Sequence, residues 1–454
     1  MLSQSDLTKK LIQLSEDSRI VRLKNVLCDI DTQIYLVGGL IRDSAFEIPA
    51  KDIDLTTNAE INLIIKKANS ASIRVTETGI KHNTITLLPV SDLPSIEITS
   101  FRKPKDDNSP ACLMTDLTLR DFTVNAIAFS IENNSIIDPL NGYKDLVNNI
   151  LRAPIDPASR FNEDPLRILR MVRLCATHRF LYDPITYEAA QNYVPKLSQV
   201  SAERVRDEFS RILLSPYPSQ GLRDLQNLKI LDLLFPEIAE FVDYEQNQFH
   251  KSDLFNHTLD VIEKTSPDLI LRLAALLHDV GKPASLTIGV DGSRHFYRHE
   301  SIGAKLSKQF LERLKFSKEQ TSTVASLVKL HMRPLEAGAG GLRRLLRDSG
   351  EQYLRWRALK EADALSCKVG ACQVKNKLKE FDDRINEIRN DPLIANSTKL
   401  NISGYDLIKL GHSPGPKFGK ILKSLREHVI DHPEDNNADK LLSIVTQRFR
   451  SKDK

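Results

Sequence analysis

Hydrophobic positions change their spacing along the 454-residue chain, and this change divides it into four stretches. Between residues 33 and about 150, short apolar runs of strand type alternate with polar turns, and helical spacing appears over residues 59–70. From residue 154 to about 242 the strand pattern stops, and apolar residues recur every three or four positions. The pattern predicts a mixed α/β segment followed by a long helical one.

The second half of the chain keeps the helical spacing but differs in chemistry. Five of the eleven histidines fall between His257 and His331, and the residues after about 369 are polar, with a Gly- and Pro-rich turn at residues 411–420. We therefore expect a multidomain protein with an α/β head, containing a mixed sheet and helices, followed by all-α parts. The expected divisions are an N-terminal helix at 1–30, the head at 31–150, a helical neck at 151–245, a second helical domain at 246–370 and a helical tail at 371–454.

Composition narrows the class of protein without naming a function. Hydrophobic residues make up 41% and charged residues 27% of the chain, close to the averages for soluble globular proteins. The net charge of +4 gives no strong overall field, so a site for a polyanion must come from local clustering. Five scattered cysteines favour a reducing compartment. With no membrane span or signal-peptide pattern in the sequence, we expect a cytoplasmic protein without a membrane partner.

A glycine turn and a pair of aspartates form the first candidate site. Gly38 and Gly39 end a predicted strand and precede a helix, an arrangement that lets a phosphate approach the backbone. Asp52 and Asp54 are two residues apart, so on a strand both carboxylates point to one face, where they would favour Mg²⁺. Glu97 lies in another strand-like run and could complete a catalytic set of three acids. The alternative is a solvated acidic pair on an edge strand.

A predicted helix carries charged residues at intervals of three. Asp164, Arg167, Arg170 and Arg173 would lie along one drifting stripe, with the apolar Leu166, Leu169 and Val172 beside it. A carboxylate next to a guanidinium offers both hydrogen-bond acceptors and donors, so Asp164 and Arg167 could bind the edge of a cytosine or adenine. Arg170 and Arg173 suit a triphosphate or stacking. The alternative is local, with Asp164 as a helix cap and the arginines in surface ion pairs.

Histidines and aspartates in the second half form another candidate site. His278 and Asp279 are adjacent on an otherwise apolar predicted helix, and a buried ionisable pair needs partners, for which a metal is one solution. The further candidates are His257, His299, His331 and Asp363. Imidazole and carboxylate ligands suit a divalent transition metal, and a metal-bound water could then attack a phosphoester. His295 has no place in this set.

Five motifs in order resemble one enzyme family. LVGGLIRD, KDIDL, DLTLRDFTVNAIAF, DPLNGYKDL and RFNEDPLRILRMVRL are similar to the class II nucleotidyltransferase family of CCA-adding tRNA enzymes and bacterial poly(A) polymerases. The resemblance implies that Asp52 and Asp54 bind the catalytic magnesium and that Gly39 and Arg42 contact the nucleoside triphosphate. It also implies that Arg120 and Asp121 position the nucleotide. The EDPLR element resembles the family's E-D-x-x-R, which supports nucleotide recognition by Asp164 and Arg167.

The ordered histidines and aspartates resemble a second family, the HD phosphohydrolases. The ligand order of that family maps onto His257, His278, Asp279 and Asp363, and His299 and His331 match the additional histidines of its two-metal members. The tail motif NISGYDLIKLGHSPGPKFGKIL resembles a C-terminal element that contributes to tRNA contact in the nucleotidyltransferase family. A helix-turn-helix packing element is the alternative for this tail.

Two features of the head depart from the nucleotidyltransferase family. Leu119 stands where members that add the full CCA usually have a first arginine before Arg120, and the stretch from Arg102 to Asp116 is shorter than the usual flexible loop. The short stretch resembles CC-adding members. We expect transfer of CMP and AMP from CTP and ATP to the tRNA 3′ end, with release of pyrophosphate. The alternatives are CC addition only, poly(A) synthesis, or a metal phosphohydrolase with a nucleotide-sensing head.

Overall fold

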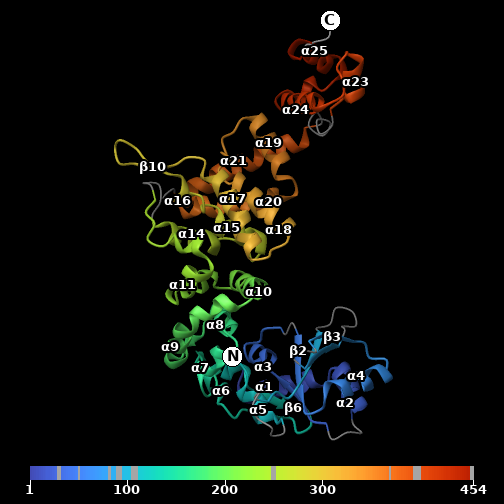
Figure 1. Cartoon of the computed structure of the whole chain (residues 1–454), viewed down its shortest axis with the longest axis vertical. Helices are drawn as coiled ribbons and strands as arrows, with labels where there is room; N and C mark the ends of the chain where they lie inside the picture. Colours follow the sequence, from blue (N-terminus) through green and yellow to red (C-terminus); the bar gives the residue numbers. More distant parts are fainter. Residues whose placement is uncertain are drawn as a thin grey trace. The chain divides into compact units, whose positions relative to one another are not determined.

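In a computed structural model the chain forms two compact units, Met1–Leu234 and Phe235–Lys454. The order of their helices and strands can be followed in Figure 1. The structure describes residues 1–27, 32–49, 52–79, 83–87, 95–103, 111–246, 252–367, 370–391 and 400–449. The expected fold class, a mixed-sheet head followed by mostly helical parts, is confirmed.

The first unit is built on a seven-stranded sheet with the order β3-β4-β5-β2-β1-β6-β7. Its strands are β1 (Ile34–Val37), β2 (Asp52–Thr57), β3 (Val75–Gly79), β4 (Thr84–Leu87), β5 (Ser95–Ser100), β6 (Ala128–Ser130) and β7 (Ser135–Ile137). β2 and β5 pair in parallel, and the other neighbours in the sheet are antiparallel. Inward-facing Ile53, Leu55, Ile96 and Ile98 are buried, so the polar residues between them lie on the opposite face of β2 and β5.

Short helices accompany the sheet. They are α1 (Gln4–Ser15), α2 (Ser18–Leu27), α3 (Gly39–Ala45), α4 (Ile61–Ser70), α5 (Leu113–Thr118) and α6 (Gly142–Val147), with a 3₁₀ turn at Thr123–Asn125. α1 packs on α3 and α2 on α4. The pattern predicts a single helix at residues 1–30, but the structure has two, separated at Glu16 and Asp17.

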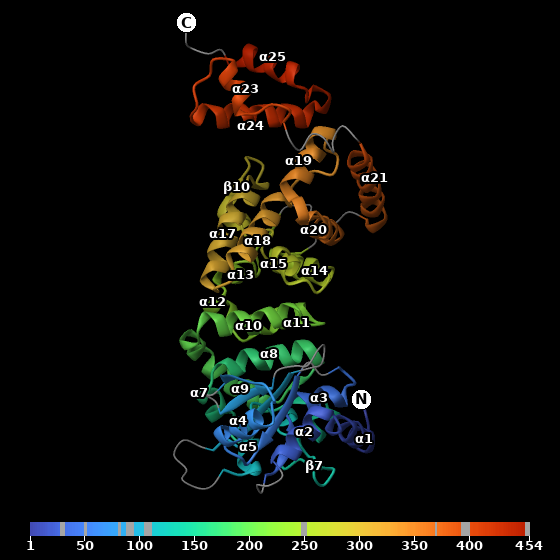
Figure 2. The same cartoon turned by 90° about the vertical axis from the view of Figure 1, so that its right-hand side faces the viewer.

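The remainder of the first unit is helical, as predicted, except for one short strand pair. Its helices are α7 (Pro157–Glu163), α8 (Leu166–His178), α9 (Pro184–Tyr193), α10 (Ala202–Leu213), α11 (Pro218–Asn227) and α12 (Ile230–Leu234), with a 3₁₀ helix at Val194–Gln199. The strand pair is β8 (Ile150–Leu151) with β9 (Leu181–Tyr182). α8 packs against α10 and α11 (Figure 2) through its buried face, which includes the predicted Leu166, Leu169 and Val172.

The second unit is almost entirely helical. Its first part contains α13 (Pro236–Ala239), α14 (Leu254–Glu263), α15 (Leu269–Leu277), α16 (Lys282–Ser285), α17 (His299–Arg313), α18 (Lys318–Leu330), α19 (Ala339–Ser349), α20 (Tyr353–Ser366) and α21 (Ala371–Asn390), with a 3₁₀ turn at Gly350–Gln352. A hairpin of β10 (Leu286–Ile288) and β11 (Arg294–Phe296) interrupts the segment that the pattern predicts to be helical. Trp356 is fully buried, and its indole N–H donates to the Leu330 carbonyl.

The end of the chain has a core of its own. α23 (Gly404–Lys409), α24 (Pro416–Asp431) and α25 (Ala438–Arg448), with a 3₁₀ turn at Pro433–Asp435, enclose Leu407, Ile421, Leu425, Leu441 and Val445. This packing agrees with the helical tail that the sequence predicts. Among the described residues, no helix is both long and apolar enough to span a membrane.

Candidate active site and metal cluster

A tight glycine turn brings two candidate residues of the head together. Gly38 lies between β1 and α3 with φ of +75°, a conformation that L side chains rarely adopt. A Cβ atom on Gly38 would lie 3.1 Å from Arg120 Nη1 and 3.1 Å from Asp54 Oδ2. Glycine is therefore needed here for its backbone angle and for its small size, because the turn passes directly between the acid and the arginine.

Three carboxylates lie on the two parallel strands. Asp54 is opposite Glu97 in the register of β2 and β5, and Asp52 is opposite Ser95, which donates a hydrogen bond to it. Burial and then the charges of Glu97 and Asp52 raise the pKa of Asp54 to about 6, although Arg120 and Arg42 oppose the shift. Burial and Asp52 also raise the pKa of Glu97. Carboxylates that repel one another in this way form a hard oxygen donor set that fits a divalent cation.

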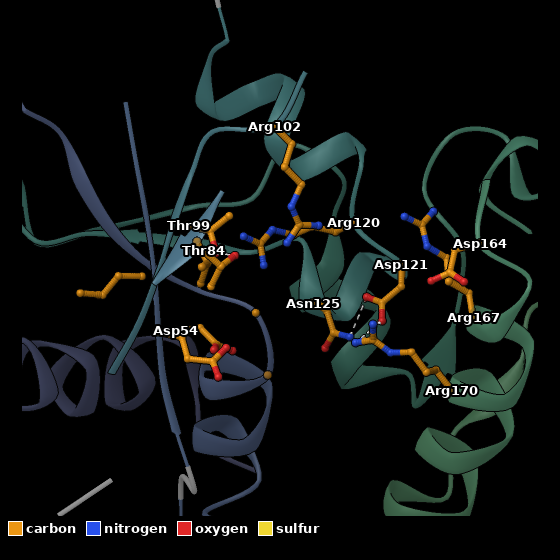
Figure 3. Close-up of a pocket in the computed structure, with 15 residues that line it drawn as sticks. Asp54, Thr84, Thr99, Arg102, Arg120, Asp121, Asn125, Asp164, Arg167 and Arg170 are labelled. Atoms are coloured by element: carbon orange, nitrogen blue, oxygen red, sulfur yellow. Dashed lines mark hydrogen bonds and ion pairs between the residues drawn. The ribbon is translucent and has the colours of Figure 1, made fainter. Parts of the chain in front are cut away.

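These acids border a cavity of about 350 Å³ in the first unit. Figure 3 shows it between the strand residues Asp54, Thr84 and Thr99 and the helix residues Arg167 and Arg170. The predicted site residues among its lining are Gly38, Gly39, Asp54, Glu97, Arg120, Asp121, Asp164, Arg167 and Arg170. Carboxylates of the sheet thus share one cavity with arginines of α8 and with Arg102 and Arg120, which follow β5 and α5.

Buried acids hold two of the cavity arginines. Arg120 Nη2 is 2.9 Å from Asp116 Oδ2, and Arg170 Nη2 is 2.8 Å from Asp121 Oδ2. Burial alone would raise the pKa of Asp121, but Arg170, the Asn125 amide and other arginines lower it to about 2. Asp121 is therefore ionised at neutral pH and fixes the position of the Arg170 guanidinium.

Asp164 and Arg167 both line the cavity, but their contacts are with other residues. Asp164 Oδ2 is 2.8 Å from Arg204 Nη2, and Asp164 Oδ1 accepts from the Leu166 N–H at 3.2 Å. Arg167 donates to the carbonyl of Leu119 at 3.1 Å and lies 3.3 Å from Glu163. Asp164 therefore lies at the cavity and also accepts from the first N–H of α8, although Pro165 and not Asp164 occupies the N-cap position.

Three predicted residues are not among the described residues that line this cavity. Arg42 is buried and donates to Asn125 Oδ1 at 2.5 Å, and Asp52 lies exposed at the start of β2. Arg173 Nε is 2.6 Å from Glu208 Oε2 of α10. Arg42 thus supports the cavity wall through Asn125, whereas Arg173 pairs with the neighbouring helix.

The structure adds residues that the sequence pattern did not single out. Arg102, at the end of β5, and Asn125 line the cavity, and the fully buried Asp116 lies behind Arg120. Asn125 lies four residues after Asp121, and this spacing in the sequence could have indicated Asn125 as a further site residue. Of the shortened stretch between Arg102 and Asp116, residues 104–110 lie outside the described residues, so the expectation based on its length has no structural counterpart here.

The second unit brings together all six histidines and aspartates predicted for its site. Asp279 Oδ2 lies 3.1 Å from His278 Nε2 and 3.7 Å from His257 Nε2, whereas Asp279 Oδ1 lies 3.3 Å from His299 Nε2 and 3.7 Å from His331 Nε2. Asp363 Oδ1 is 3.3 Å from His257 Nε2. Asp279 therefore lies between two histidine pairs, and its two carboxylate oxygens belong to two groups of side chains that could each hold a metal ion.

Backbone carbonyl groups orient three of the imidazole rings in this cluster. The Nδ1 atoms of His278, His299 and His331 lie 2.6 to 2.8 Å from the carbonyl oxygen three residues earlier in each case. A ring that donates from Nδ1 presents an unprotonated Nε2, which is the form that binds a metal. His278 follows the last residue of α15, so it lies at the end of the predicted helix and Asp279 lies beyond it. The donor set fits divalent transition metals.

A cavity of about 560 Å³ opens beside this cluster. Lys282 lies in its wall, with Nζ 2.6 Å from Asp279 Oδ2, and Cys367 lies near His257 and Asp363. His295, which had no place in the predicted set, also lines the cavity and contacts Ser293 Oγ at 2.8 Å. Burial alone would raise the pKa of Asp279, but the neighbouring His278 and Lys282 hold that pKa well below its usual range.

Comparison with known proteins identifies three domains in the chain. Residues 34–152 match the "Poly A polymerase head domain", residues 180–242 the "Probable RNA and SrmB- binding site of polymerase A", and residues 254–367 the "HD domain". The chain is 34% identical over 335 residues to an A-adding tRNA nucleotidyltransferase of Deinococcus radiodurans, covering 70% of this chain and 75% of that protein. It is 28% identical over 425 residues to a CCA-adding enzyme of Streptococcus thermophilus, covering 91% and 92%.

Solved structures share the fold. The Bacillus stearothermophilus CCA-adding enzyme in complex with CTP matches with a TM-score of 0.70 and 21% identity, covering 94% of this chain and 96% of that one. The Thermotoga maritima CCA-adding enzyme complexed with tRNA matches with a TM-score of 0.57 and 19% identity, covering 97% and 98%.

Strand carboxylates beside an arginine-lined cavity, in a head domain of this kind, define a nucleotidyltransferase. The sequence identity to the Deinococcus radiodurans relative, and the share of the chain that it covers, show the family. The chain belongs to the tRNA nucleotidyltransferases and poly(A) polymerases, and its second unit contains an HD domain. Both domains imply that the protein depends on divalent metal ions.

Proposed function

We propose that this chain adds C and A residues to the 3′ end of tRNA, using CTP and ATP without a nucleic-acid template. The observation that carries this proposal is one cavity in which Asp54 and Glu97 face Arg102, Arg120, Arg167 and Arg170. Acids for a cation and arginines for phosphates, at this spacing, suit phosphoryl chemistry. The choice of tRNA as acceptor rests on the names of the relatives.

In this proposal the catalytic metal is Mg²⁺, held by Asp52 and Asp54 with Glu97 beside them. When bound, Mg²⁺ would neutralise charge on the triphosphate and favour ionisation of the attacking 3′-hydroxyl. The turn at Gly38 and Gly39 lets the phosphates approach the backbone, and Arg120 and Arg170, fixed by Asp116 and Asp121, orient them. Catalysis then consists of holding the hydroxyl, the α-phosphate and the leaving pyrophosphate in line.

Base selection is proposed for Asp164 and Arg167. Each is held by a partner outside the pair, Arg204 for Asp164 and the Leu119 carbonyl for Arg167, so their remaining donors and acceptors can contact the base. Arg42 acts indirectly in this proposal, through Asn125 in the cavity wall. A role of Arg173 in nucleotide binding stays a prediction, and its contact with Glu208 of α10 favours a role in supporting the helix.

The test uses tRNAs that lack CCA, or that end in C or CC, each incubated with CTP, ATP or both. A CCA-adding enzyme completes every acceptor when both nucleotides are present. Extension only of the tRNA ending in CC, with ATP alone, would match the activity named for the Deinococcus radiodurans relative. Arrest after CC, or long A tracts on any RNA, would identify the CC-adding or poly(A) alternatives. No incorporation into any acceptor would reject the proposal.

A second activity is proposed for the HD domain, the metal-dependent hydrolysis of phosphoesters. It rests on the Nε2 atoms of four histidines that converge on Asp279, with Asp363 beside them and an open cavity at the cluster. A divalent transition metal bound there would supply an activated water. Hydrolysis of p-nitrophenyl phosphate by the full chain, stimulated by Mn²⁺, Ni²⁺ or Co²⁺ and abolished by a chelator, is the test.

We further infer a finer division than the two compact units. The head at 31–150, the neck at 151–245, the HD domain at 246–370 and the tail at 371–454 would be separate domains, a division supported by the three family matches. The neck and the tail are proposed to contact tRNA, and the protein is proposed to act in the cytoplasm.

A further inference from the structure

Arg102 is the cavity arginine with the weakest hold on a counter-ion. Its Nε lies 3.6 Å from Asp116 Oδ1, beyond hydrogen-bond distance for charged groups, whereas Arg120 contacts Asp116 Oδ2 at 2.9 Å. Among the described residues, the hydrogen bond of Arg102 comes from its backbone N–H, which donates to Asp116 Oδ1 at 3.2 Å. Its backbone thus fixes the start of the side chain, and within the part of the chain that the structure describes no hydrogen bond engages the guanidinium.

The cavity arginines differ in their acidic partners. Asp116 is fully buried and carries one negative charge, yet two guanidinium groups share it, those of Arg102 and Arg120. Arg170 has Asp121, and Arg167 has Glu163. Among the described residues, Arg102 is therefore the cavity arginine without a carboxylate at hydrogen-bond distance from its guanidinium, and its side chain is 43% exposed. Figure 3 shows Arg102 and Arg120 between the acidic strand residues and α8.

We propose that Arg102 is a triphosphate-binding residue. This inference rests on the proposed nucleotidyltransferase function. A guanidinium recognises phosphate oxygens in bidentate fashion, so an arginine that lines the cavity beside the carboxylates favours the anionic triphosphate over the uncharged base. Arg102 would therefore act equally on CTP and ATP.

Inorganic tripolyphosphate isolates this contact, because it has no base or sugar. Its binding to the full chain is measured by titration calorimetry for the unmodified protein, Arg102→Gln, Arg102→Lys and the control Lys103→Gln, which removes the same charge one residue away. We expect Arg102→Gln to weaken binding by about 10-fold or more, Arg102→Lys to weaken it less, and Lys103→Gln to change it less than about twofold. Tripolyphosphate affinity in Arg102→Gln equal to that of Lys103→Gln would overturn the proposal.

Two further measurements keep the result interpretable. The KM for CTP and for ATP should rise by the same factor in Arg102→Gln, whereas a change in the ratio of the two would overturn the assignment to the triphosphate. If Arg102→Gln fails to fold, Arg102→Lys, which keeps the charge near Asp116, decides: unchanged tripolyphosphate affinity in that variant overturns the proposal. The protein could bind tripolyphosphate through Arg102 and yet extend no tRNA. That result would reject the proposed function but support Arg102 as a triphosphate-binding residue.

Discussion

Asp54 occupies a position where its negative charge is unfavourable until a cation arrives. It is largely shielded from solvent on β2, with Glu97 across the register and Asp52 two residues away. These surroundings raise its pKa to about 6 from a usual value of 3.8. The ionised carboxylate thus reduces stability at neutral pH, a cost that is common at functional sites and that fits the proposed role of Asp54 in binding a metal.

Asp54→Asn is expected to abolish nucleotide addition and to stabilise the metal-free protein. Nucleotide incorporation should fall at least 100-fold, because the replacement amide cannot neutralise a cation. The free energy of unfolding without divalent cations should rise by roughly 1–3 kcal/mol at pH 7.5, because the cost of burying the charge and its repulsion by Glu97 and Asp52 are removed. Incorporation into tRNA and chemical denaturation in a chelator provide the two measurements.

The exposed Glu132→Gln is the matched control for Asp54→Asn, since it removes one carboxylate charge from the same unit, outside the cavity. It should leave both incorporation and stability near those of the unmodified protein. Normal incorporation in Asp54→Asn would contradict the assignment of the acids to catalysis.

His178, at the end of α8, gives the first unit an acid-sensitive point. Its side chain is 2% exposed and packs between the rings of Phe46 and Phe180. Burial, and then the charges of Arg42 and Arg173, lower its pKa from 6.5 to about 3. Because the folded-state pKa is lowered, the stability contributed by neutral His178 is complete above pH 6.5 and is lost as the pH falls from 6.5 towards 3.

His178→Phe keeps an aromatic ring and removes this titration. Between pH 7 and pH 5, the unmodified protein should lose about 2 kcal/mol of stability at α8 that the variant does not lose. Hydrogen exchange of peptides from α8 measures the stability of this helix at each pH. The exposed His432→Phe should keep the pH dependence of the unmodified protein, and an identical pH profile in His178→Phe would refute the prediction.

At the scale of elements, the arginines of α8 have two different roles. Arg167 and Arg170 line the cavity, whereas Arg173 pairs with Glu208 of α10 in a contact whose side chains are only 16% and 9% exposed. Two partly desolvated charges that face one another are costly to separate, because the remaining partner is left unpaired. This second role is structural support of the helix that carries the cavity residues.

Arg173→Met is therefore expected to destabilise the protein by about 2–4 kcal/mol, and the double change Arg173→Met with Glu208→Met to recover at least half of this loss. The choice between CTP and ATP should be unaffected in the double variant. Unfolding midpoints and single-nucleotide incorporation measure the two effects. A changed CTP-to-ATP preference in the stable double variant would instead place Arg173 among the nucleotide-binding residues.

The same helix illustrates what the sequence can and cannot predict. Apolar spacing is enough to predict α8 and its buried face, since that period depends only on local geometry. The partners of Asp164 and Arg167 were not predictable, because Arg204 and the Leu119 carbonyl approach from other elements. Arg102 and Asp116 were not singled out for the same reason. Asp116 begins the DLTLRDFTVNAIAF motif, but it lies 14 residues after Arg102, and only the fold brings the two together.

The strand acids were more accessible to prediction. Alternation on a strand places Asp52 and Asp54 on one face, but strand order cannot be read from spacing, so the position of Glu97 beside Asp54 depended on the parallel pairing of β2 with β5. In the second unit, the ordered histidines and aspartates predicted the cluster, and the lysine of HDVGK was a further signal for Lys282. The β10–β11 hairpin was missed because its strands are only three residues long.

At the scale of the whole molecule, two donor sets of different chemistry lie in different units. The first unit offers carboxylates alone, and the second offers mostly imidazoles arranged around Asp279. Hard oxygen donors favour Mg²⁺, and nitrogen-rich donors favour later divalent metals. The two sites should consequently load different ions from a mixture, so that a change in one donor set alters one activity.

Asp279→Asn tests this independence, because Asp279 is the carboxylate shared by both histidine groups. Its loss should reduce the transition metal bound to the purified protein at least 10-fold and remove the rise in melting temperature on adding Mn²⁺ or Ni²⁺. Phosphoester hydrolysis should disappear, and nucleotide addition should stay within about twofold.

Asp260→Asn changes an exposed aspartate of α14 and is the control. It should retain the bound metal, phosphoester hydrolysis and nucleotide addition. Metal content unchanged in Asp279→Asn would show that these residues are not the ligands, and loss of addition together with hydrolysis would show that the second unit supports the first unit's activity rather than carrying an independent one.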